Sequence, residues 1–176
     1  MLTGSQILEN LNTNIIIEPF DPLQLNPNSY NVRLANKLLV YDNDILDMKK
    51  KNPCHLITIP EEGLVIQPGK LYLGSTMERT ETKNYVPAID GRSSVGRLGI
   101  SVHATAGFGD IGFCGYWTLE IFCVQPVRIY PGVEIGQLYY EEVSDKGELP
   151  TYVSTKYQNN TGVQPSMMWM DFEKKG

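Results

Sequence analysis

Asp90-Gly-Arg-Ser-Ser-Val-Gly-Arg-Leu-Gly99 concentrates residue types that bind anions. It places two arginines, two adjacent serines and three glycines within ten residues. Arginine binds phosphate through forked, charge-assisted hydrogen bonds, serine hydroxyls and backbone N–H groups add donors, and glycine lets the backbone approach a ligand closely. A glycine-containing turn into a short surface helix is the alternative interpretation. The residues that follow favour phosphate binding.

Two isolated carboxylates, Asp110 and Glu120, follow this stretch closely. Asp110 lies among glycines, which is typical of a turn aspartate and also of a carboxylate that holds a water beside a phosphate. Glu120 lies in an apolar strand, where an ionised carboxylate is costly to bury unless it is paired. It is therefore either half of an ion pair, for example with Arg97, or a general base. Together with the phosphate-binding stretch, the two carboxylates predict chemistry on a nucleotide.

The length of 176 residues predicts a single domain, 1–176, that folds without disulfides or a structural metal. The net charge of −5 argues against a nucleic-acid polymer as partner but permits a nucleotide. Cys54, Cys114 and Cys123 form no short-spaced pair, which indicates free, mostly buried thiols in a reducing compartment. The sequence shows neither a signal-peptide pattern nor a membrane span, so we expect a cytoplasmic protein without membrane contact.

The pattern of the chain predicts one short helix followed by many short strands. Thr3 to Leu11 reads as the helix, with Thr3 and Gln6 in the capping-box positions. Turn residues separate the strands that follow, as in an all-β sandwich or jelly roll. The predicted strands are Val32–Leu34, Leu38–Tyr41, Leu56–Ile59, Leu64–Ile66, Leu71–Gly74, Tyr85–Ile89, Ser101–Ala104, Thr118–Val124, Val127–Tyr130 and Ile135–Glu141.

Two stretches, 64–75 and 127–138, resemble each other: each reads as strand, Pro-Gly turn, strand. This pattern predicts two β-hairpins, one on each half of the fold.

From about Ser144 to the end, the pattern gives way to polar and turn residues such as Asp145-Lys-Gly-Glu148. Residues 144–176 are either a disordered tail or a lid that folds over a ligand. In a lid, Lys156 would supply charge, Tyr152 and Tyr157 stacking or hydroxyl contacts, and Gly162 a hinge. The apolar tail residues suit docking on a neighbour; they are Val163, Met167, Met168, Trp169 and Phe172.

Two familiar catalytic patterns do not fit. Zinc deaminases use Pro-Cys-x-x-Cys, but Cys54 is followed by His55-Leu-Ile57, and His103-Ala-Thr105 lacks the glutamate of the partner motif. Ser93, His103 and Asp110 occur without a Gly-x-Ser-x-Gly element, and Arg92 beside Ser93 favours anion binding over a nucleophile. The mechanism that these residues still allow is attack by a water that a carboxylate directs.

With these residues assembled, the chain resembles the dCTP deaminase family of the dUTPase-like superfamily. The resemblance covers most of the chain, and its motifs occur in the family's order. They are Asn28–Leu34, Asp90–Gly99, Val102–Gly115, Thr118-Leu-Glu120, Ile135–Leu138 and Lys156-Tyr-Gln158.

The resemblance implies a mainly β, jelly-roll-like distorted barrel or sandwich with a short N-terminal helix and a C-terminal lid. It implies a homotrimer with active sites between subunits and no zinc. Glu120 would activate the water that attacks C4 of cytosine, with Ser93 and the Ala106 carbonyl positioning that water and Arg97 supporting the network. Mg²⁺ would enter bound to the triphosphate. His103 lies where members of the family switch to an inactive form when dTTP binds.

Substrate binding is implied for a wider set of residues. Arg92, Ser93, Ser94, Gln137 and Lys156 would hold the triphosphate. Thr118, within Thr118-Leu119-Glu120, would contribute to the pyrimidine pocket, Asp110 would bind the sugar, and Tyr152 and Asn160 would act from the lid.

The resemblance also addresses the product. Plain deaminases of the family tend to have histidine after Thr-Ala, whereas the dUMP-forming members tend to have glycine, as in Thr105-Ala-Gly107. We therefore expect deamination of dCTP by Glu120, followed by cleavage to dUMP and pyrophosphate aided by Asp110, which supplies a thymidylate precursor. The alternatives are a deaminase that releases dUTP, a pure dUTPase, a nucleotide-binding switch, and a structural subunit. Four features depart from the family pattern: Gly109, Ile111, the spacing from Tyr152 to Lys156, and Asn160 in place of a lid glutamine.

Overall fold

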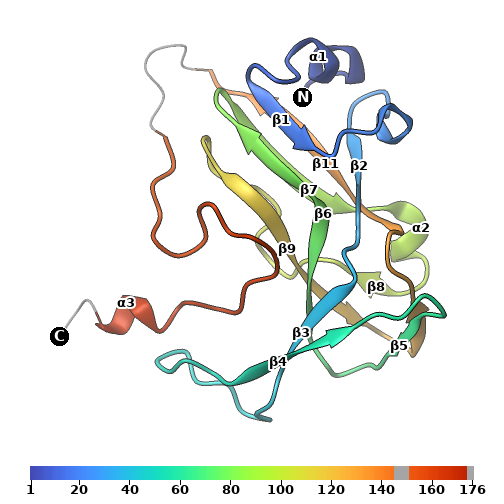
Figure 1. Cartoon of the computed structure of the whole chain (residues 1–176), viewed down its shortest axis with the longest axis vertical. Helices are drawn as coiled ribbons and strands as arrows, with labels where there is room; N and C mark the ends of the chain where they lie inside the picture. Colours follow the sequence, from blue (N-terminus) through green and yellow to red (C-terminus); the bar gives the residue numbers. More distant parts are fainter. Residues whose placement is uncertain (145–150, 174–176) are drawn as a thin grey trace.

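The computed structural model describes residues 1–144 and 151–173, and antiparallel strands dominate it (Figure 1). The predicted mainly β fold is confirmed. The strands are β1 (Ile15–Glu18), β2 (Tyr30–Arg33), β3 (Lys37–Tyr41), β4 (Cys54–Thr58), β5 (Leu64–Ile66), β6 (Tyr72–Thr82), β7 (Tyr85–Gly91), β8 (Ile100–Ser101), β9 (Cys114–Cys123), β10 (Val127–Ile129) and β11 (Glu134–Glu142). The helices are α1 (Gly4–Glu9), η1 (Pro22–Gln24), α2 (Ser93–Gly96) and α3 (Met170–Glu173).

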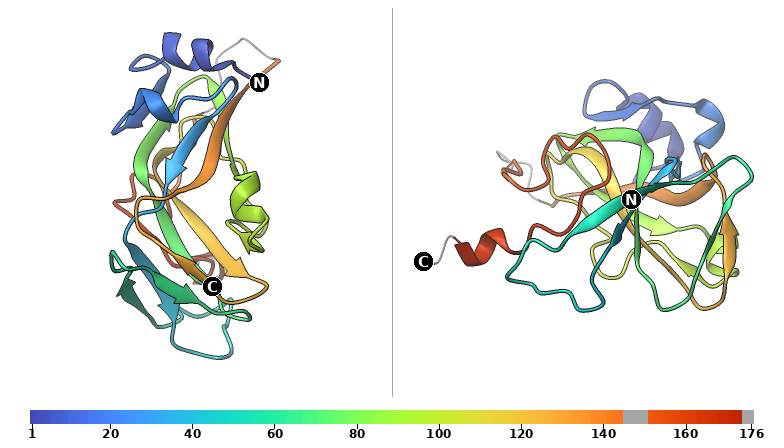
Figure 2. Two further views of the ribbon diagram at one scale, coloured as in Figure 1. Left: turned by 90° about the vertical axis from the view of Figure 1, so that its right-hand side faces the viewer. Right: turned by 60° about the horizontal axis from the view of Figure 1, so that its bottom comes forward.

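Three sheets build the sandwich. The largest has the order β4-β3-β6-β9-β8, with β1 paired to the far end of β6. A three-stranded sheet, β2-β11-β7, faces it, and β5 pairs with β10 in a two-stranded sheet (Figure 2). One core lies between the layers, because residues from both larger sheets, such as Leu119, Ile121, Leu138 and Tyr140, are buried in the same cluster.

The N-terminal helix begins as predicted. The Thr3 hydroxyl accepts a hydrogen bond from the Gln6 N–H, and the Gln6 side chain accepts one from the Thr3 N–H, so the capping box is complete. The helix ends at Glu9, two residues earlier than predicted, and Ile7 is its buried apolar residue. Strand β1 was missed, because its apolar run follows the helix closely and its partner in β6 lies far along the chain.

The prediction of two hairpins was wrong. β5 and β10, the first strands of the two similar stretches, pair with each other through Ile66 opposite Val127 and Leu64 opposite Ile129. The strands after the two turns cannot fold back on them, because both edges of β6 are taken by β9 and by β3 and β1, and both edges of β11 by β2 and β7. Each Pro-Gly turn therefore sends the chain into another sheet.

Strand β6 is longer than predicted because its second half points polar side chains inward. Glu78, Thr80 and Thr82 are buried, and an apolar pattern does not detect such residues. The register with β9 also shifts: Ser75 lies opposite Thr118, whereas Arg79 lies opposite Tyr116. Residues 76–78 therefore bulge opposite Trp117, and a bulge of this kind leaves backbone groups without ladder partners.

Polar side chains supply hydrogen-bond partners for the backbone groups at this bulge. The Thr76 hydroxyl accepts a hydrogen bond from the Trp117 N–H at 3.1 Å and donates to the Glu78 carbonyl at 2.8 Å. The Trp117 indole N–H donates to the Thr80 hydroxyl at 2.9 Å. The bulge therefore fixes β6 to β9 through side chains in place of the backbone ladder.

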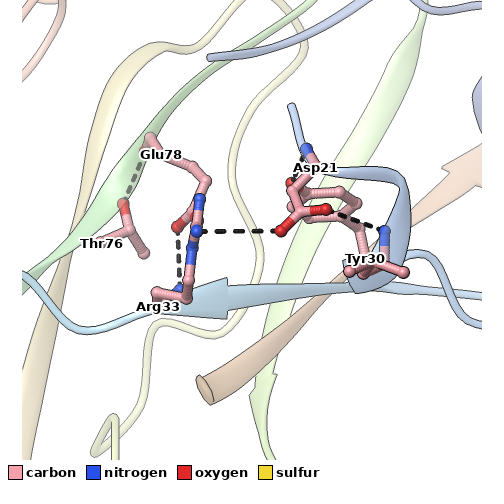
Figure 3. A network of polar contacts seen from close by, with 6 residues as sticks. Asp21, Tyr30, Arg33, Thr76 and Glu78 are labelled. Atoms are coloured by element: carbon pink, nitrogen blue, oxygen red, sulfur yellow. Dashed lines mark hydrogen bonds and ion pairs between the residues drawn. The ribbon is translucent and has the colours of Figure 1, made fainter. Parts of the chain in front are cut away.

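Glu78 ties the bulge to the opposite sheet (Figure 3). Its carboxylate is fully buried and accepts two hydrogen bonds from Arg33 of β2, one from the backbone N–H at 2.8 Å and one from Nε at 2.6 Å. On its other side, the Arg33 guanidinium lies 4.0 Å from Asp21. The hydrogen bond with Glu78 raises the pKa of Arg33 above its usual value, so the guanidinium remains charged.

The three cysteines are free, with Cys114 and Cys123 buried and Cys54 half-buried, as predicted. Burial raises the pKa of all three thiols above the ordinary cysteine value. Among the described residues, no helix is long and apolar enough to cross a membrane.

Loss of the Arg33 side chain should destabilise the fold. In an Arg33→Met variant, the Glu78 carboxylate stays buried without its cation, and we expect the free energy of unfolding to fall by about 3–5 kcal/mol. Urea titration at fixed protein concentration measures this change. Arg128→Met serves as a control, because its guanidinium is exposed and contacts carbonyls only at 3.4 Å. Equal stability of the two variants would contradict the role assigned to Glu78.

Candidate active site

A cavity of about 510 Å³ lies where β9, the loop after β8 and the C-terminal segment meet. Cavities of this size accept small organic ligands. It is lined by Tyr41, Leu71, Leu73, Ala106, Phe108, Gly109, Asp110, Phe113, Tyr116, Trp117, Thr118, Glu120, Tyr152, Tyr157, Asn160, Gln164, Pro165 and Ser166. Seven residues predicted from the sequence are therefore brought together: Ala106, Asp110, Thr118, Glu120, Tyr152, Tyr157 and Asn160.

Glu120 reaches the cavity because side chains alternate along β9. Thr118 and Glu120 face the cavity, while Leu119 between them is fully buried in the core. Leu119, included with Thr118 and Glu120 among the predicted substrate-binding residues, does not line the cavity, and its contact with a ligand stays a prediction. Glu120 is half-buried, and its Oε2 accepts a hydrogen bond from the Ala104 N–H at 2.7 Å. This bond ties the carboxylate to the loop after β8. The described residues contain no ion pair between Glu120 and Arg97, so the ion-pair interpretation is not supported.

The loop after β8 carries Ala106 and Asp110, and backbone hydrogen bonds hold it against β7. The Gly107 carbonyl accepts from the Ile89 N–H at 2.6 Å, and the Gly109 N–H donates to the Pro87 carbonyl at 2.7 Å. Asp110 is exposed at the cavity wall and also lines an adjoining hollow of about 370 Å³. A carboxylate in this position faces both the cavity and its mouth.

Aromatic rings line one side of the cavity. The rings of Trp117 and Phe113 lie 5.2 Å apart, and those of Phe113 and Tyr152 lie 6.4 Å apart. Burial raises the pKa of Tyr41, whose hydroxyl accepts a hydrogen bond from the Ser166 N–H. Flat apolar walls of this kind suit a planar ring such as a nucleobase.

The predicted phosphate-binding residues lie elsewhere in the chain. Ser93 and Ser94 lie in α2, Arg92 precedes it and Arg97 follows it, and none of the four lines the cavity. Figure 1 shows α2 on the side of the molecule opposite the C-terminal segment. Arg92 is paired with Glu134, whereas Ser93, Ser94 and Arg97 are exposed. Gln137 lies near this group, since β11 pairs with β7 through Gln137 opposite Asp90.

His103 lies between the two groups. Its Nε2 is 3.6 Å from Asp90, and its Nδ1 is buried without a hydrogen-bond partner among the described residues. The ring also limits the loop, because a Cβ at Gly107 would lie 2.9 Å from its Cε1. The ring therefore packs closely against the loop that carries Ala106 and Asp110.

The described part of the C-terminal segment, 151–173, packs on its own chain. Tyr152, Tyr157 and Asn160 line the cavity, while Lys156 lies outside it and bonds both carboxylate oxygens of Asp171 at 2.5 Å. The apolar tail residues lie along the β3–β4 side, where the Lys49 ammonium is 5.5 Å from the Phe172 ring centre. Met168 and Phe172 each remain 39% exposed, and docking of these residues on a neighbour stays a prediction. The stretch Asp145–Glu148 lies outside the described residues.

Sequence reasoning missed Gln164 and two rings of the aromatic wall, Phe113 and Trp117. The Gln164 N–H donates to the Thr118 hydroxyl at 3.1 Å, and its side chain lines the cavity. No local pattern separates Gln164 from the other polar tail residues, although aromatic residues flanking Glu120 were a usable signal. A larger cavity of about 820 Å³, near β3 and residues 131–132, shares Tyr116 and Gln164 but contains none of the predicted residues. Volume alone does not identify the site.

These features define a β-sandwich protein with an aromatic-walled cavity that contains two carboxylates, and with a separate exposed group of serines and arginines. The chain belongs to the dCTP deaminase-like family, whose model matches residues 1–143.

Curated relatives match almost the full chain. The protein named dCTP deaminase, dUMP-forming, of Clostridium beijerinckii is 63% identical over 174 residues, 99% of each chain. The protein of the same name from Hathewaya histolytica is 64% identical over 173 residues, 98% of this chain and 99% of that one. Among solved structures, the 2′-deoxycytidine 5′-triphosphate deaminase of Agrobacterium tumefaciens matches with a TM-score of 0.66 at 20% identity. That match covers 81% of this chain and 47% of the Agrobacterium chain, and it supports the fold.

Proposed function

We propose that this protein converts dCTP and two waters into dUMP, pyrophosphate and ammonia. One observation carries the proposal: Glu120 and Asp110, predicted for two different steps, line the same cavity. The near full-length relatives named dCTP deaminase, dUMP-forming, support the same reaction. The product is a thymidylate precursor.

In the first step, Glu120 takes a proton from water as the water oxygen bonds to C4 of cytosine. This proton passes to the amino group, the second proton of the water ends on N3 as the C4 carbonyl forms, and the C4–N bond breaks. Ammonia leaves, and a uracil ring remains. The hydrogen bond from the Ala104 N–H holds one carboxylate oxygen of Glu120 and leaves the other to act as base. The Ala106 carbonyl, on the same loop, would accept a hydrogen bond from the attacking water.

In the second step, a second water attacks the α-phosphorus and pyrophosphate leaves. Asp110, exposed at the cavity mouth, would orient this water, and it is also available to the sugar hydroxyl. Mg²⁺ would neutralise the charge on the phosphate oxygens. This Mg²⁺ would be bound mainly by phosphate oxygens and water, as is usual for the ion. We retain a deamination without zinc, because Cys54 lacks the second cysteine of the zinc motif.

The phosphate-binding residues would come from a neighbouring copy. Ser93, Ser94 and Arg97 are exposed and lie outside the cavity of their own chain. In a closed homotrimer, α2 of one copy would face the cavity of the next. Arg92, Ser93, Ser94 and Gln137 would then hold the triphosphate, Ser93 would also position the water, and Arg97 would support the network around Glu120. The proposal includes two further points. Binding of dTTP would inhibit the enzyme through a shift of His103, and the protein would be cytoplasmic. A deaminase that releases dUTP and a nucleotide-binding switch are the alternatives.

Product analysis tests the proposal directly. Purified protein is incubated with dCTP and Mg²⁺, and dUTP, dUMP, pyrophosphate and ammonia are separated and quantified. We expect dUMP and pyrophosphate in equal amounts without free dUTP. Accumulation of dUTP would show the plain deaminase instead, and binding without turnover would indicate the switch.

Glu120→Gln should abolish ammonia release and leave nucleotide binding nearly unchanged. The amide keeps the acceptor for the Ala104 N–H but cannot take a proton, and loss of a general base lowers the rate by roughly 10²–10⁴-fold. Ammonia release and calorimetric titration with dCTP measure the two quantities. Retained deamination would remove Glu120 from the mechanism.

Asp110→Asn should impair phosphate cleavage more than deamination. An amide cannot orient water as a carboxylate does, so we expect this variant to release dUTP where the wild type releases dUMP. The ratio of dUTP to dUMP is the measurement, with Asp44→Asn, at an exposed position outside the cavity, as control. Equal loss of both steps would assign Asp110 to sugar binding alone.

Mixing two inactive variants should restore activity if the site lies between copies. Ser93→Ala and Glu120→Gln chains would be unfolded and refolded together in equal amounts. Random assembly of a cyclic trimer then leaves roughly a quarter of the sites with both residues intact. Refolding each variant alone is the control, and a mixture no more active than its parts would place Ser93 and Glu120 in one chain's site.

A further inference from the structure

Part of β9 has an edge without a strand partner. On one side, β9 pairs with β6 along most of its length. On the other side, β8 pairs only with Phe122 and Cys123. Along this edge, residues Cys114 to Thr118 therefore present backbone N–H and C=O groups that no described strand satisfies, and Tyr116, Trp117 and Thr118 line the cavity.

Side-chain amides of the C-terminal segment take the place of that strand. Gln158 Oε1 accepts a hydrogen bond from the Cys114 N–H at 3.0 Å, and its Nε2 donates to the Gly112 carbonyl at 2.7 Å. Asn160 Oδ1 accepts from the Tyr116 N–H at 3.1 Å, and its Nδ2 donates to the Tyr116 carbonyl at 3.1 Å. Between them, the Asn159 N–H donates to the Cys114 carbonyl at 2.7 Å. We call residues 158–160 the amide clamp.

The spacing of the clamp matches a strand. Gln158 and Asn160 are two residues apart and bind Cys114 and Tyr116, also two residues apart, which is the period at which N–H groups point to one edge. Gly115 between them makes room, because a Cβ at this position would lie 2.7 Å from Asn160 Nδ2. Both sides of the contact are therefore built for close approach.

The clamp fixes the residues that close the cavity. Tyr157 precedes it, and beyond it the chain returns to β9, where the Gln164 N–H donates to the Thr118 hydroxyl. Tyr157, Asn160 and Gln164 line the cavity, whereas Gln158 does not. Gln158 thus contacts the backbone of Gly112 and Cys114, which adjoin the cavity-lining residues Phe113 and Tyr116 in the chain, and not the space that a nucleotide would occupy.

We propose that Gln158 is a positioning residue that holds the segment 157–164 against β9 before the nucleotide binds. When this wall is ordered in advance, nucleotide binding does not carry the entropy cost of ordering it. Gln158 therefore strengthens substrate binding and leaves the chemical steps unchanged. The inference rests on the proposed function for its kinetic consequence. The order of the segment without nucleotide can be tested independently.

The experiment compares Gln158→Met with the wild type, because methionine has a similar length and lacks both hydrogen-bonding atoms. Amide hydrogen exchange without nucleotide reports on the N–H groups of Cys114 and Asn159, which the clamp protects. We expect exchange at both to become about tenfold faster. The KM for dCTP should rise about tenfold, with kcat within about twofold of the wild type.

Two further variants sharpen the comparison. Gln67→Met makes the same change at an exposed position outside the cavity and should alter neither quantity. Gln158→Glu keeps an acceptor for the Cys114 N–H but loses the donor to the Gly112 carbonyl, so both effects should be smaller. It also replaces the methionine variant if that variant does not fold.

Unchanged exchange at Cys114 in the methionine variant would overturn the proposal, and so would faster exchange with an unchanged KM. A fall in kcat at constant KM would equally overturn it, since positioning of the wall acts on binding. Failure of the proposed function is distinguishable, because it appears as a wild type that does not convert dCTP. In that case, exchange at Cys114 and calorimetric binding of dCTP still decide the role of Gln158.

Discussion

The bulge in β6 is the constraint on which the rest of the structure depends. Residues 76–78 lie opposite Trp117, and the mismatch would leave the Trp117 N–H unsatisfied if Thr76 did not accept it. The same bulge carries Glu78, whose buried carboxylate holds Arg33 of the opposite sheet. This one bulge thus sets the distance between the sheets and the position of β9. Thr118 and Glu120 follow Trp117 directly, so the geometry of the site derives from this bulge.

Local patterns allowed much of the fold to be predicted. The Thr3 capping box, the short strands and the free thiols follow from neighbouring residues and appear as expected. Long-range pairing was not predictable in the same way. The true length of β6 depends on buried polar residues such as Thr80, which resemble exposed ones until their partners are known. The pairing of β5 with β10 depends on which strand edges remain free, and that is decided by the whole topology.

The candidate site likewise has residues that local patterns predict and residues whose role depends on the whole fold. Thr118 and Glu120 alternate with the buried Leu119, so their common orientation follows from strand periodicity. Ala106 and Asp110 join them because backbone bonds to β7 hold their loop. The residues of α2 share a motif but not the cavity, since sequence proximity does not determine which surface of a chain they occupy. Gln164 was missed because its role arises from where the segment lies, not from its neighbours.

The topology also bears on how the chain reaches its native state. The strand β2, near the N-terminus, pairs with β11, the last strand, and β1 pairs with the far end of β6. Such non-local pairings slow folding, because a large loop must close before any contact offsets its entropy. During synthesis, β2 would wait with an open edge until β11 emerges from the ribosome. Tyr30 and Val32, fully buried in the finished protein, would be exposed throughout that interval. The nascent chain therefore passes through a stage at which aggregation competes with folding.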